Sequence, residues 1–327
     1  MEDVARIAGV SPITVSRALS KPDMVSPRSR EAVARAIAAT GYVRNLVAGS
    51  LASQKTHVVA AVVPTFANPV FAATLVSMEA ALQAKGFHLM LGQSGATPQT
   101  QHALISTFLA RRPDGFFLHG NRCAPETRRM LVQAGIPIVE GANLRDDPID
   151  MLVSFSNFDA AKALTRHLID RGYRRIGFAS PPWRHNDRAR ARRRGYIAAL
   201  ADAGLAVSER RIVETPLGFR EGGEALRALL ERDKRLDACF LAGDVLAAGA
   251  LFECHRSGRR VPDDMGIAGF DDQDIASATS PQITTVHVPR QEIGRIAAEM
   301  ILARIDGRAD VDRRVDVGFD IRVRQST

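Results

Sequence analysis

The chain has 327 residues, of which 46% are hydrophobic and 24% charged, and it carries a formal net charge of +8. This composition is typical of a globular protein, and the length predicts two or three domains. The sequence holds no apolar run near the ~18 residues of a membrane span, and its opening, MEDVARIAGV, lacks the layout of a secretion signal. The three cysteines have no paired spacing, so we expect a cytoplasmic protein without a disulfide framework.

The positive charge is concentrated at the start of the chain. Residues 1–55 hold eight Lys or Arg and four Asp or Glu, a net charge of +4 in about a sixth of the sequence. A basic segment of this kind favours a polyanionic partner, with nucleic acid as the first candidate. An inert basic surface is the alternative that charge alone leaves open.

The same segment has the pattern of three short helices. An apolar stripe over residues 4–8 predicts the first, and the pairs Ser11-Pro12 and Ser26-Pro27 each place a capping hydroxyl before a proline that suits the first helical position. Two short helices joined by a glycine-containing turn predict a helix-turn-helix, whose second helix enters the DNA major groove. A protein-docking module of three small helices is the alternative.

The stretch VARIAGVSPITVSRAL, followed by VSPRSREAVARAIAATGYVRN, resembles the lactose-repressor (LacI/GalR) family of bacterial transcription regulators. The resemblance implies a double-stranded DNA operator as partner. Arginine can pair bidentately with guanine, and small hydroxyl residues can hold phosphates. The contacts that the resemblance implies are base reading by Pro12, Ile13 and Arg17, and phosphate binding by Ser11, Thr14 and Ser16.

The next stretch, YVRNLVAGSLASQKT, resembles the hinge of that family, which is helical only on DNA. A short, glycine-containing segment is marginal as a free helix, so it can fold when a partner is present. The resemblance implies minor-groove contacts by Asn45 and Ala48 and a wedge between base steps formed by Leu51.

Two departures from the family pattern occur in this region. The usual Thr or Ser cap of the first helix would fall before Met1, so either the true start lies upstream or the helix is uncapped, at a cost of about 1 kcal/mol. Arg44 stands where a proline commonly precedes the hinge asparagine. We expect a helix-turn-helix domain over 1–44 and a hinge and linker over 45–56.

From His57 onward, short apolar runs such as VVAAVVP, DGFFLHG, RRIGFAS and DACFLAGD alternate with helical stretches. This alternation predicts an α/β fold with parallel sheets covered by helices, and it begins again midway. The core, 57–327, should therefore form two doubly wound lobes of the periplasmic-binding-protein type. The expected first lobe comprises about 57–155 plus 287–309, and the second about 156–286 plus 310–327.

Ligands of such sheets bind beyond the carboxyl ends of the strands. Polar residues that follow predicted strands are therefore site candidates, although any one of them could be a solvated loop residue. These candidates are Thr65, Gln93, Glu140, Arg192, Asp244, Asp271 and Asp272.

An arginine run over 184–194 precedes the apolar face of one helix in the second lobe. The apolar stripe of that helix predicts that Arg192 or Arg193 points inward. The other arginines can then point outward, namely Arg188, Arg190 and Arg194. A partly buried guanidinium needs an acceptor, either a ligand carboxylate or hydroxyl or a structural carboxylate of the protein. The run lies far from the helix-turn-helix, so we do not expect it to bind DNA.

The family resemblance implies effector contacts by Arg192, before Gly195-Tyr196, and by Asp271 in GFDDQD. It also implies that Phe155 closes the cleft, and Phe71 in FANPVFAATL belongs to the same expected site. Gly243 replaces an asparagine that family members often have, so one ligand hydrogen bond is lost or moved. Other stretches, including FANPVFAATL and ILARIDG, resemble the gluconate-utilisation repressor branch, which implies gluconate or a related sugar acid, including a phosphorylated one.

Two other classes of protein compete with a regulator. A sugar-processing enzyme is disfavoured because the sequence has no GxxxxGK, HExxH or G-x-S-x-G motif, so no catalytic residue, metal or cofactor is expected. A soluble sugar-binding protein would share the two-lobed core, but it would lack the DNA-binding domain that the first residues of this chain predict. We expect a homodimer on a near-palindromic operator, from which a sugar-acid effector releases it, and no membrane partner.

Overall fold

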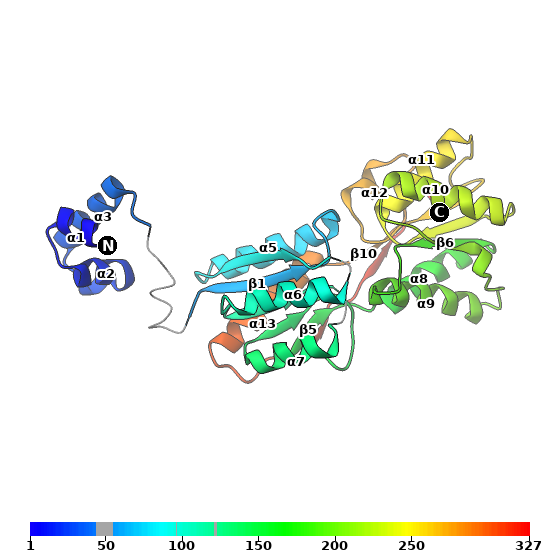
Figure 1. Ribbon diagram of the computed structural model, residues 1–327. Coiled ribbons are helices and arrows are strands. Elements are labelled where there is room, and N and C mark those ends of the chain that lie inside the picture. Colours follow the sequence, from blue (N-terminus) through cyan, green and yellow to red (C-terminus); the bar gives the residue numbers. More distant parts are fainter. Residues whose placement is uncertain (44–54, 96, 121–122) are drawn as a thin grey trace. The chain divides into compact units, whose positions relative to one another are not determined.

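The computed structural model describes residues 1–43, 55–95, 97–120 and 123–327. The chain divides into two compact units, Met1–Thr56 and His57–Thr327, called the headpiece and the core below (Figure 1). The predicted hinge contacts Asn45, Ala48 and Leu51 lie outside the described residues. No helix in the described part of the chain is long and apolar enough to cross a membrane.

The headpiece contains the predicted helix-turn-helix. Its elements are α1 (Glu2–Ala8), α2 (Pro12–Ser20), a short 3-10 turn (Pro22–Met24) and α3 (Pro27–Thr40). Gly9, at φ 64°, ends α1 in the left-handed region that glycine tolerates. The Ser11 hydroxyl accepts a hydrogen bond from the Thr14 amide at 3.2 Å, and this cap starts α2. No side chain caps α1 at Met1.

A small apolar core holds these helices together. It consists of Val4, Ala5, Val15, Val33 and Ala36, which are all buried. The stripe of each helix therefore faces inward, and the opposite face of α2 is left to solvent.

The first lobe of the core is a parallel sheet of six strands in the order β11-β5-β4-β3-β1-β2. Its strands are β1 (Val58–Val63), β2 (His88–Gln93), β3 (Gly115–Leu118), β4 (Ile138–Glu140), β5 (Met151–Ser154) and β11 (Arg314–Asp316). Its helices are α5 (Ala72–Gln83), α6 (Pro98–Leu109), α7 (Pro125–Ala134) and α13 (Arg290–Ile305), and a 3-10 turn (Pro69–Phe71) precedes α5.

Alternation along β1 explains why helices cover both faces of this sheet (Figure 1). Val59, Ala61 and Val63 pack with α5 and α13, whereas Ala60 and Val62 pack with α6 and α7. Successive side chains of a strand point to opposite faces, so a continuous apolar run buries both.

The second lobe has a parallel sheet of four strands in the order β7-β6-β8-β9. Its strands are β6 (Ile176–Ser180), β7 (Ile212–Glu214), β8 (Ala238–Leu241) and β9 (Gly266–Ala268). Its helices are α8 (Asn157–Asp170), α9 (Asp187–Asp202), α10 (Phe219–Arg232), α11 (Asp244–Arg256) and α12 (Asp274–Ala278), with a 3-10 turn at Glu209–Arg211. Helices α8 and α9 pack together, as do α10 and α11.

The chain crosses between the lobes after β5, before α13 and between the last two strands. An antiparallel pair, β10 (Thr285–His287) and β12 (Asp320–Arg322), lies at these crossings. The expected assignment of all of 310–327 to the second lobe is wrong, because β11 pairs with β5 of the first sheet. The tail VDVGFDI is therefore divided between β11 and β12, and its glycine, Gly318 at φ 69°, makes the turn between them.

Candidate functional site

Helix α2 presents the predicted DNA-contacting residues on its outer face. Pro12, Ile13 and Arg17 are exposed, whereas Thr14 and Ser16 are half-buried. Ile13 is 64% exposed, so its apolar side chain is available to a partner. Two or three apolar and basic side chains that stand together at the start of a recognition helix can reach base edges.

Ser11 has a structural role, the capping of α2, in addition to its predicted phosphate contact. Its hydroxyl caps α2 and also lies 2.9 Å from the hydroxyl of Thr14. Both hydroxyls are exposed, so a phosphate at the start of α2 can reach them along with the free amides of the first turn.

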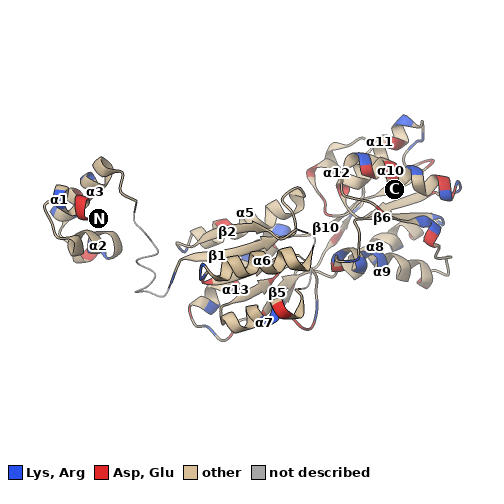
Figure 2. Cartoon of the chain, in the orientation of Figure 1, with Lys and Arg blue, Asp and Glu red and all other residues tan. Residues whose placement is uncertain are grey.

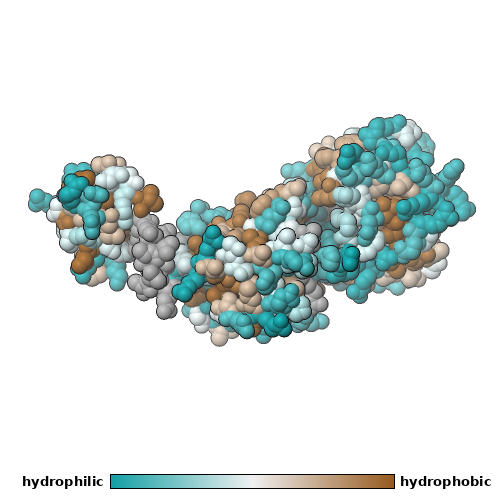
Figure 3. Space-filling model, viewed as in Figure 1, coloured by the Kyte–Doolittle hydropathy of each residue, from teal (hydrophilic) through white to brown (hydrophobic). Residues whose placement is uncertain are grey.

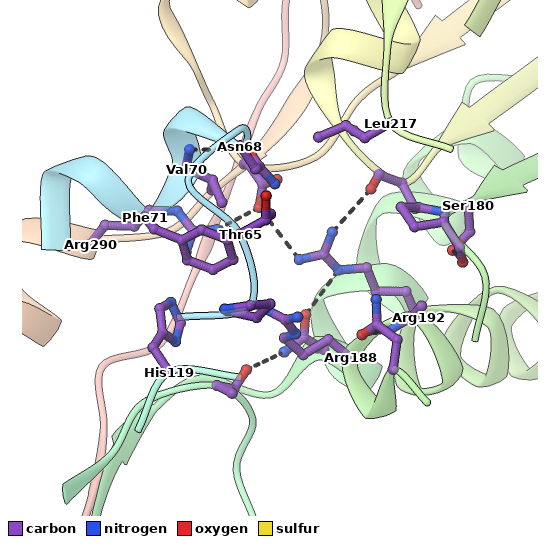
Figure 4. A pocket seen from close by; sticks show the side chains of 18 of the residues that line it. Thr65, Asn68, Val70, Phe71, His119, Ser180, Arg188, Arg192, Leu217 and Arg290 are labelled. Carbon is purple, nitrogen blue, oxygen red and sulfur yellow. Dashed lines mark hydrogen bonds and ion pairs between the residues drawn. The ribbon is translucent and has the colours of Figure 1, made fainter. Parts of the chain in front are cut away.

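A cavity of about 190 Å³ lies where the two lobes of the core meet (Figure 4). Both lobes contribute to its lining, which consists of Pro64, Thr65, Asn68, Val70, Phe71, His119, Ala142, Phe155, Asn157, Ser180, Pro181, Asn186, Arg188, Ala189, Arg192, Leu217, Ala242, Asp271 and Arg290. The cavity is smaller than the ~300–1,000 Å³ typical of drug-sized ligands, which suits a small molecule.

Arg192 is held firmly by the second lobe. Its Nε donates to Asn157 Oδ1 at 2.9 Å, its Nη1 donates to the Ala242 carbonyl at 3.1 Å, and its guanidinium carbon lies 3.6 Å from the ring centroid of Phe270. Burial lowers the pKa of Arg192 to about 10, so the group stays charged at neutral pH. Its fork is thereby oriented before any ligand arrives.

Asp271 lies between two guanidinium groups that come from different lobes. Its Oδ1 accepts from Arg192 Nη2 at 3.4 Å and from Arg290 Nη2 at 2.5 Å, and Arg290 is the first residue of α13 in the first lobe. The backbone of Asp271 has φ 108°, a conformation that L-residues rarely adopt. Such strain persists only where the surrounding contacts impose it, and it is common at functional sites.

Arg188 and His119 flank the ring of Phe71. The Arg188 guanidinium carbon is 5.6 Å from the ring centroid, and the His119 ring meets Phe71 edge-on at 4.9 Å. In Figure 4, Arg188 and Arg192 reach from α9 towards Thr65 and Phe71. Burial, with Arg188 and Arg290 nearby, holds the pKa of His119 well below its usual range, so this imidazole is neutral.

The cavity brings together five of the seven predicted effector residues, namely Thr65, Phe71, Phe155, Arg192 and Asp271. The expectation that Gln93 and Glu140 face it is wrong. Gln93 Oε1 accepts from the Phe66 amide at 2.9 Å and so supports the loop that carries Thr65. Glu140 pairs with Arg145 and accepts from the Ile149 amide at 2.7 Å, which fastens the loop after β4.

The arginine run is only partly as expected. Arg190 and Arg194 are exposed, and Figure 2 shows several basic residues along α9. Arg188, however, turns into the cavity and does not fan outward. Its spacing of four from Arg192 places both on one helix face, a signal that could have identified it. His119, Asn157 and Arg290 also line the cavity and were not predicted.

Comparisons with known proteins agree with this architecture. Residues 1–45 match the family model of bacterial regulatory proteins of the lacI family, and residues 165–327 match a periplasmic binding protein-like domain. The HTH-type transcriptional regulator GntR of Escherichia coli (strain K12) is 36% identical over 98% of this chain and 96% of its own length. The chain belongs to the lacI family of bacterial regulatory proteins.

Solved structures extend this lacI-family assignment to the whole chain. A LacI-family regulator from Silicibacter pomeroyi superposes with a TM-score of 0.93 at 31% identity, covering 99% of this chain and 98% of that one. A complex of the regulator CelR with cellobiose superposes with a TM-score of 0.75 at 33% identity, covering 100% and 99%.

The chain is therefore a DNA-binding transcriptional regulator, and repressor function is supported by its relatives. These relatives and structural neighbours are regulators and not enzymes. Regulators of this family bind DNA operators and small-molecule sugar effectors. In the described part of the chain, no group of three or more His, Cys, Asp or Glu residues is placed to hold a metal ion.

A second buried carboxylate, that of Asp244, lies close enough to Asp271 to feel its charge. Asp244, the first residue of α11, accepts from the Thr285 hydroxyl and from the Gln273 amide at 2.7 Å. Burial, together with the charge of Asp271, raises the pKa of Asp244 to about 8. Asp244 is therefore mainly protonated at neutral pH, and it adds little negative charge to the cavity.

This shift predicts a pH-dependent stability. Between the ordinary carboxyl pKa near 3.8 and about 8, the folded protein keeps a proton that the unfolded chain releases, so this group makes stability fall as pH rises. Asp244→Asn removes the titration. Urea unfolding followed by the fluorescence of Trp183 should show the variant gaining on the wild type by about 1.4 kcal/mol per pH unit from pH 5 to pH 7. A difference that stays constant over that range contradicts the protonated carboxyl.

Proposed function

We propose that the effector of this regulator is a sugar acid such as gluconate, bound in the cavity between the lobes. The observation that carries the proposal is the charge of the lining, in which Arg188, Arg192 and Arg290 face a single carboxylate, Asp271. A cavity with excess positive charge favours an anionic ligand over a neutral sugar, because buried charges need partners.

The remaining lining suits a polyol chain. Thr65, Asn68, Asn157 and Ser180 bring hydroxyl and amide groups, and Phe71 adds an apolar wall. Ligand sites commonly combine such walls with a few placed polar groups. Of the five N–H groups of Arg192, three are engaged by the partners described above, which leaves two for a carboxylate.

The same contacts suggest how the ligand is coupled to DNA binding. Asp271 links the first and second lobes through Arg290 and Arg192. An anion that binds these guanidiniums competes with Asp271 and so favours a different arrangement of the lobes. A ligand that binds one arrangement more tightly shifts the population towards it, and operator release follows if that arrangement holds DNA less well.

We further propose a homodimer on a near-palindromic operator, since a two-fold protein matches two half-sites. Large apolar side chains are exposed on four core helices, namely Val76 on α5, Val132 on α7, Phe219 on α10 and Phe252 on α11. Figure 3 shows apolar surface over the regions of α5 and of α10 to α12. Exposed apolar patches of this kind mark protein interfaces. In each headpiece, Pro12, Ile13 and Arg17 would read bases, while Ser11, Thr14 and Ser16 would contact phosphates.

Arg192→Ala tests the cavity. Calorimetric titration should show gluconate affinity falling by about tenfold or more, because a charge-assisted pair is lost. Arg194→Ala, an exposed arginine on the same helix, is the matched control and should bind gluconate normally. Unchanged gluconate affinity in Arg192→Ala, with an intact thermal transition, would place the effector elsewhere.

Arg17→Ala tests the headpiece. A gel-shift titration should show a loss of about 1–3 kcal/mol on operator DNA selected by the wild type, with residual binding to random DNA preserved. Arg35→Ala removes the same charge from an exposed site on α3 and serves as control. Equal losses of Arg17→Ala on operator and random DNA would make Arg17 a phosphate contact.

A further inference from the structure

The cavity carries more positive charge than one carboxylate can neutralise. Among the described residues, its lining holds three guanidinium groups, one carboxylate and a neutral imidazole, which gives a net charge of +2. A singly charged sugar acid leaves one buried cation uncompensated, whereas a doubly charged ligand balances the site. Asp244 does not alter this balance, because burial raises its pKa to about 8.

The uncompensated group is Arg188. Among the ion pairs of the described residues, Asp271 serves Arg192 and Arg290, and none joins a carboxylate to Arg188. Asp187 is its neighbour in the chain and contributes to its electrostatic surroundings without forming such a pair. The Nε atom of Arg188 is buried and has no hydrogen-bond partner in the described structure.

His119 provides a second incompletely partnered group at the same end of the cavity. The residue is only 3% exposed, and neither buried ring nitrogen has a side-chain partner among the described residues, the backbone of Gly141 being the one nearby group that can accept a hydrogen bond from the ring. A buried polar group without a partner costs free energy, so such groups normally meet a ligand, an ion or water. Arg188 and His119 both contact the ring of Phe71, which belongs to the first lobe. Arg192 instead contacts the ring of Phe270, which belongs to the second lobe.

We propose that Arg188 and His119 form a second anion subsite, so that the effector is a sugar acid with another anionic group at the far end of its carbon chain. This inference rests on the proposed sugar-acid function and narrows its ligand class. The chemistry fits either a sugar-acid phosphate or a dicarboxylic sugar acid. Arg192 and Arg290 take one anionic end, and Arg188 and His119 take the other.

Arginine suits this position because its fork presents parallel N–H donors to a carboxylate or phosphate. The neutral imidazole can donate one hydrogen bond and accept another, which matches a phosphate monoester or a neighbouring hydroxyl. A ligand hydroxyl could form hydrogen bonds with Arg188 and His119, but it would leave the positive charge of Arg188 without a counter-charge.

Calorimetric titration of the full-length wild-type protein tests the proposal with three ligands: gluconate, 6-phosphogluconate and glucarate. At least one of the two doubly charged ligands should bind about tenfold more tightly than gluconate, because a further charge-assisted pair forms. The tighter of the two identifies the second group as phosphate or carboxylate. Equal affinities for all three overturn the second subsite and leave the sugar-acid function standing, whereas no binding of any sugar acid overturns both.

Arg188→Gln should reduce the advantage of the doubly charged ligand, which is the ratio of its affinity to the affinity for gluconate, both measured with this variant, to about twofold or less. Arg188→Lys keeps the charge without the fork and should retain part of the advantage. Arg194→Gln removes the same charge from an exposed position on α9 and should leave the advantage intact. If Arg194→Gln and Arg188→Gln reduce it equally, the preference comes from the overall charge of the protein, and the subsite is wrong.

Discussion

The carboxylate of Asp271 joins the two lobes of the core by accepting from a guanidinium of each. Arg192 reaches it from α9, and Arg290 reaches it from the start of α13, 98 residues further along the chain. Removing one partner of a buried ion pair is costly because a charge is left exposed to an apolar interior. The left-handed backbone of Asp271 adds strain that these contacts must hold. The cavity is therefore built around an ion pair that joins the two lobes, and the proposed anion would compete with it.

The headpiece and the core differ in which of their side chains are buried and which are exposed. The headpiece buries few apolar side chains and leaves the outer face of α2 exposed, so its value lies in presenting Ile13 and Arg17 to a partner. The core buries three apolar clusters around its sheets and brings several buried or partly buried charged groups together at one cavity. Lobes connected by several crossing segments can rearrange as rigid bodies, which is the kind of motion that can couple a ligand site to a DNA-binding domain.

Local signals in the sequence predicted much of this arrangement. The Ser-Pro pairs located the starts of α2 and α3 because capping depends on adjacent residues. The alternation of apolar runs with helical stretches predicted both sheets, because parallel strands buried on two faces have a recognisable pattern. Arg192 and Asp271 were found as cavity residues because the family motifs contain them.

Other features depend on contacts that local patterns do not carry. Gln93 and Glu140 end strands at the correct edge of the sheet, but neither side chain faces the cavity. Gln93 accepts from a loop amide, and Glu140 accepts from another loop amide and pairs with Arg145. Arg290 comes to the cavity through the crossing of the chain before α13, which no short window of sequence reveals. The division of VDVGFDI between two sheets has the same origin, because it depends on which strand edge is open. His119 directly follows β3, so the search for polar residues after predicted strands could have found it.

We propose that an anion in the cavity weakens the binding of the headpieces to DNA. Fluorescence anisotropy of labelled operator DNA, selected by the wild-type protein from random sequence, can follow this effect during titration with gluconate, with its doubly charged relatives and with neutral glucose. At least one sugar acid should release the operator at concentrations where glucose does not. Release by glucose at the same concentration as the acids, or retention of the operator with every acid while calorimetry shows binding, would contradict it.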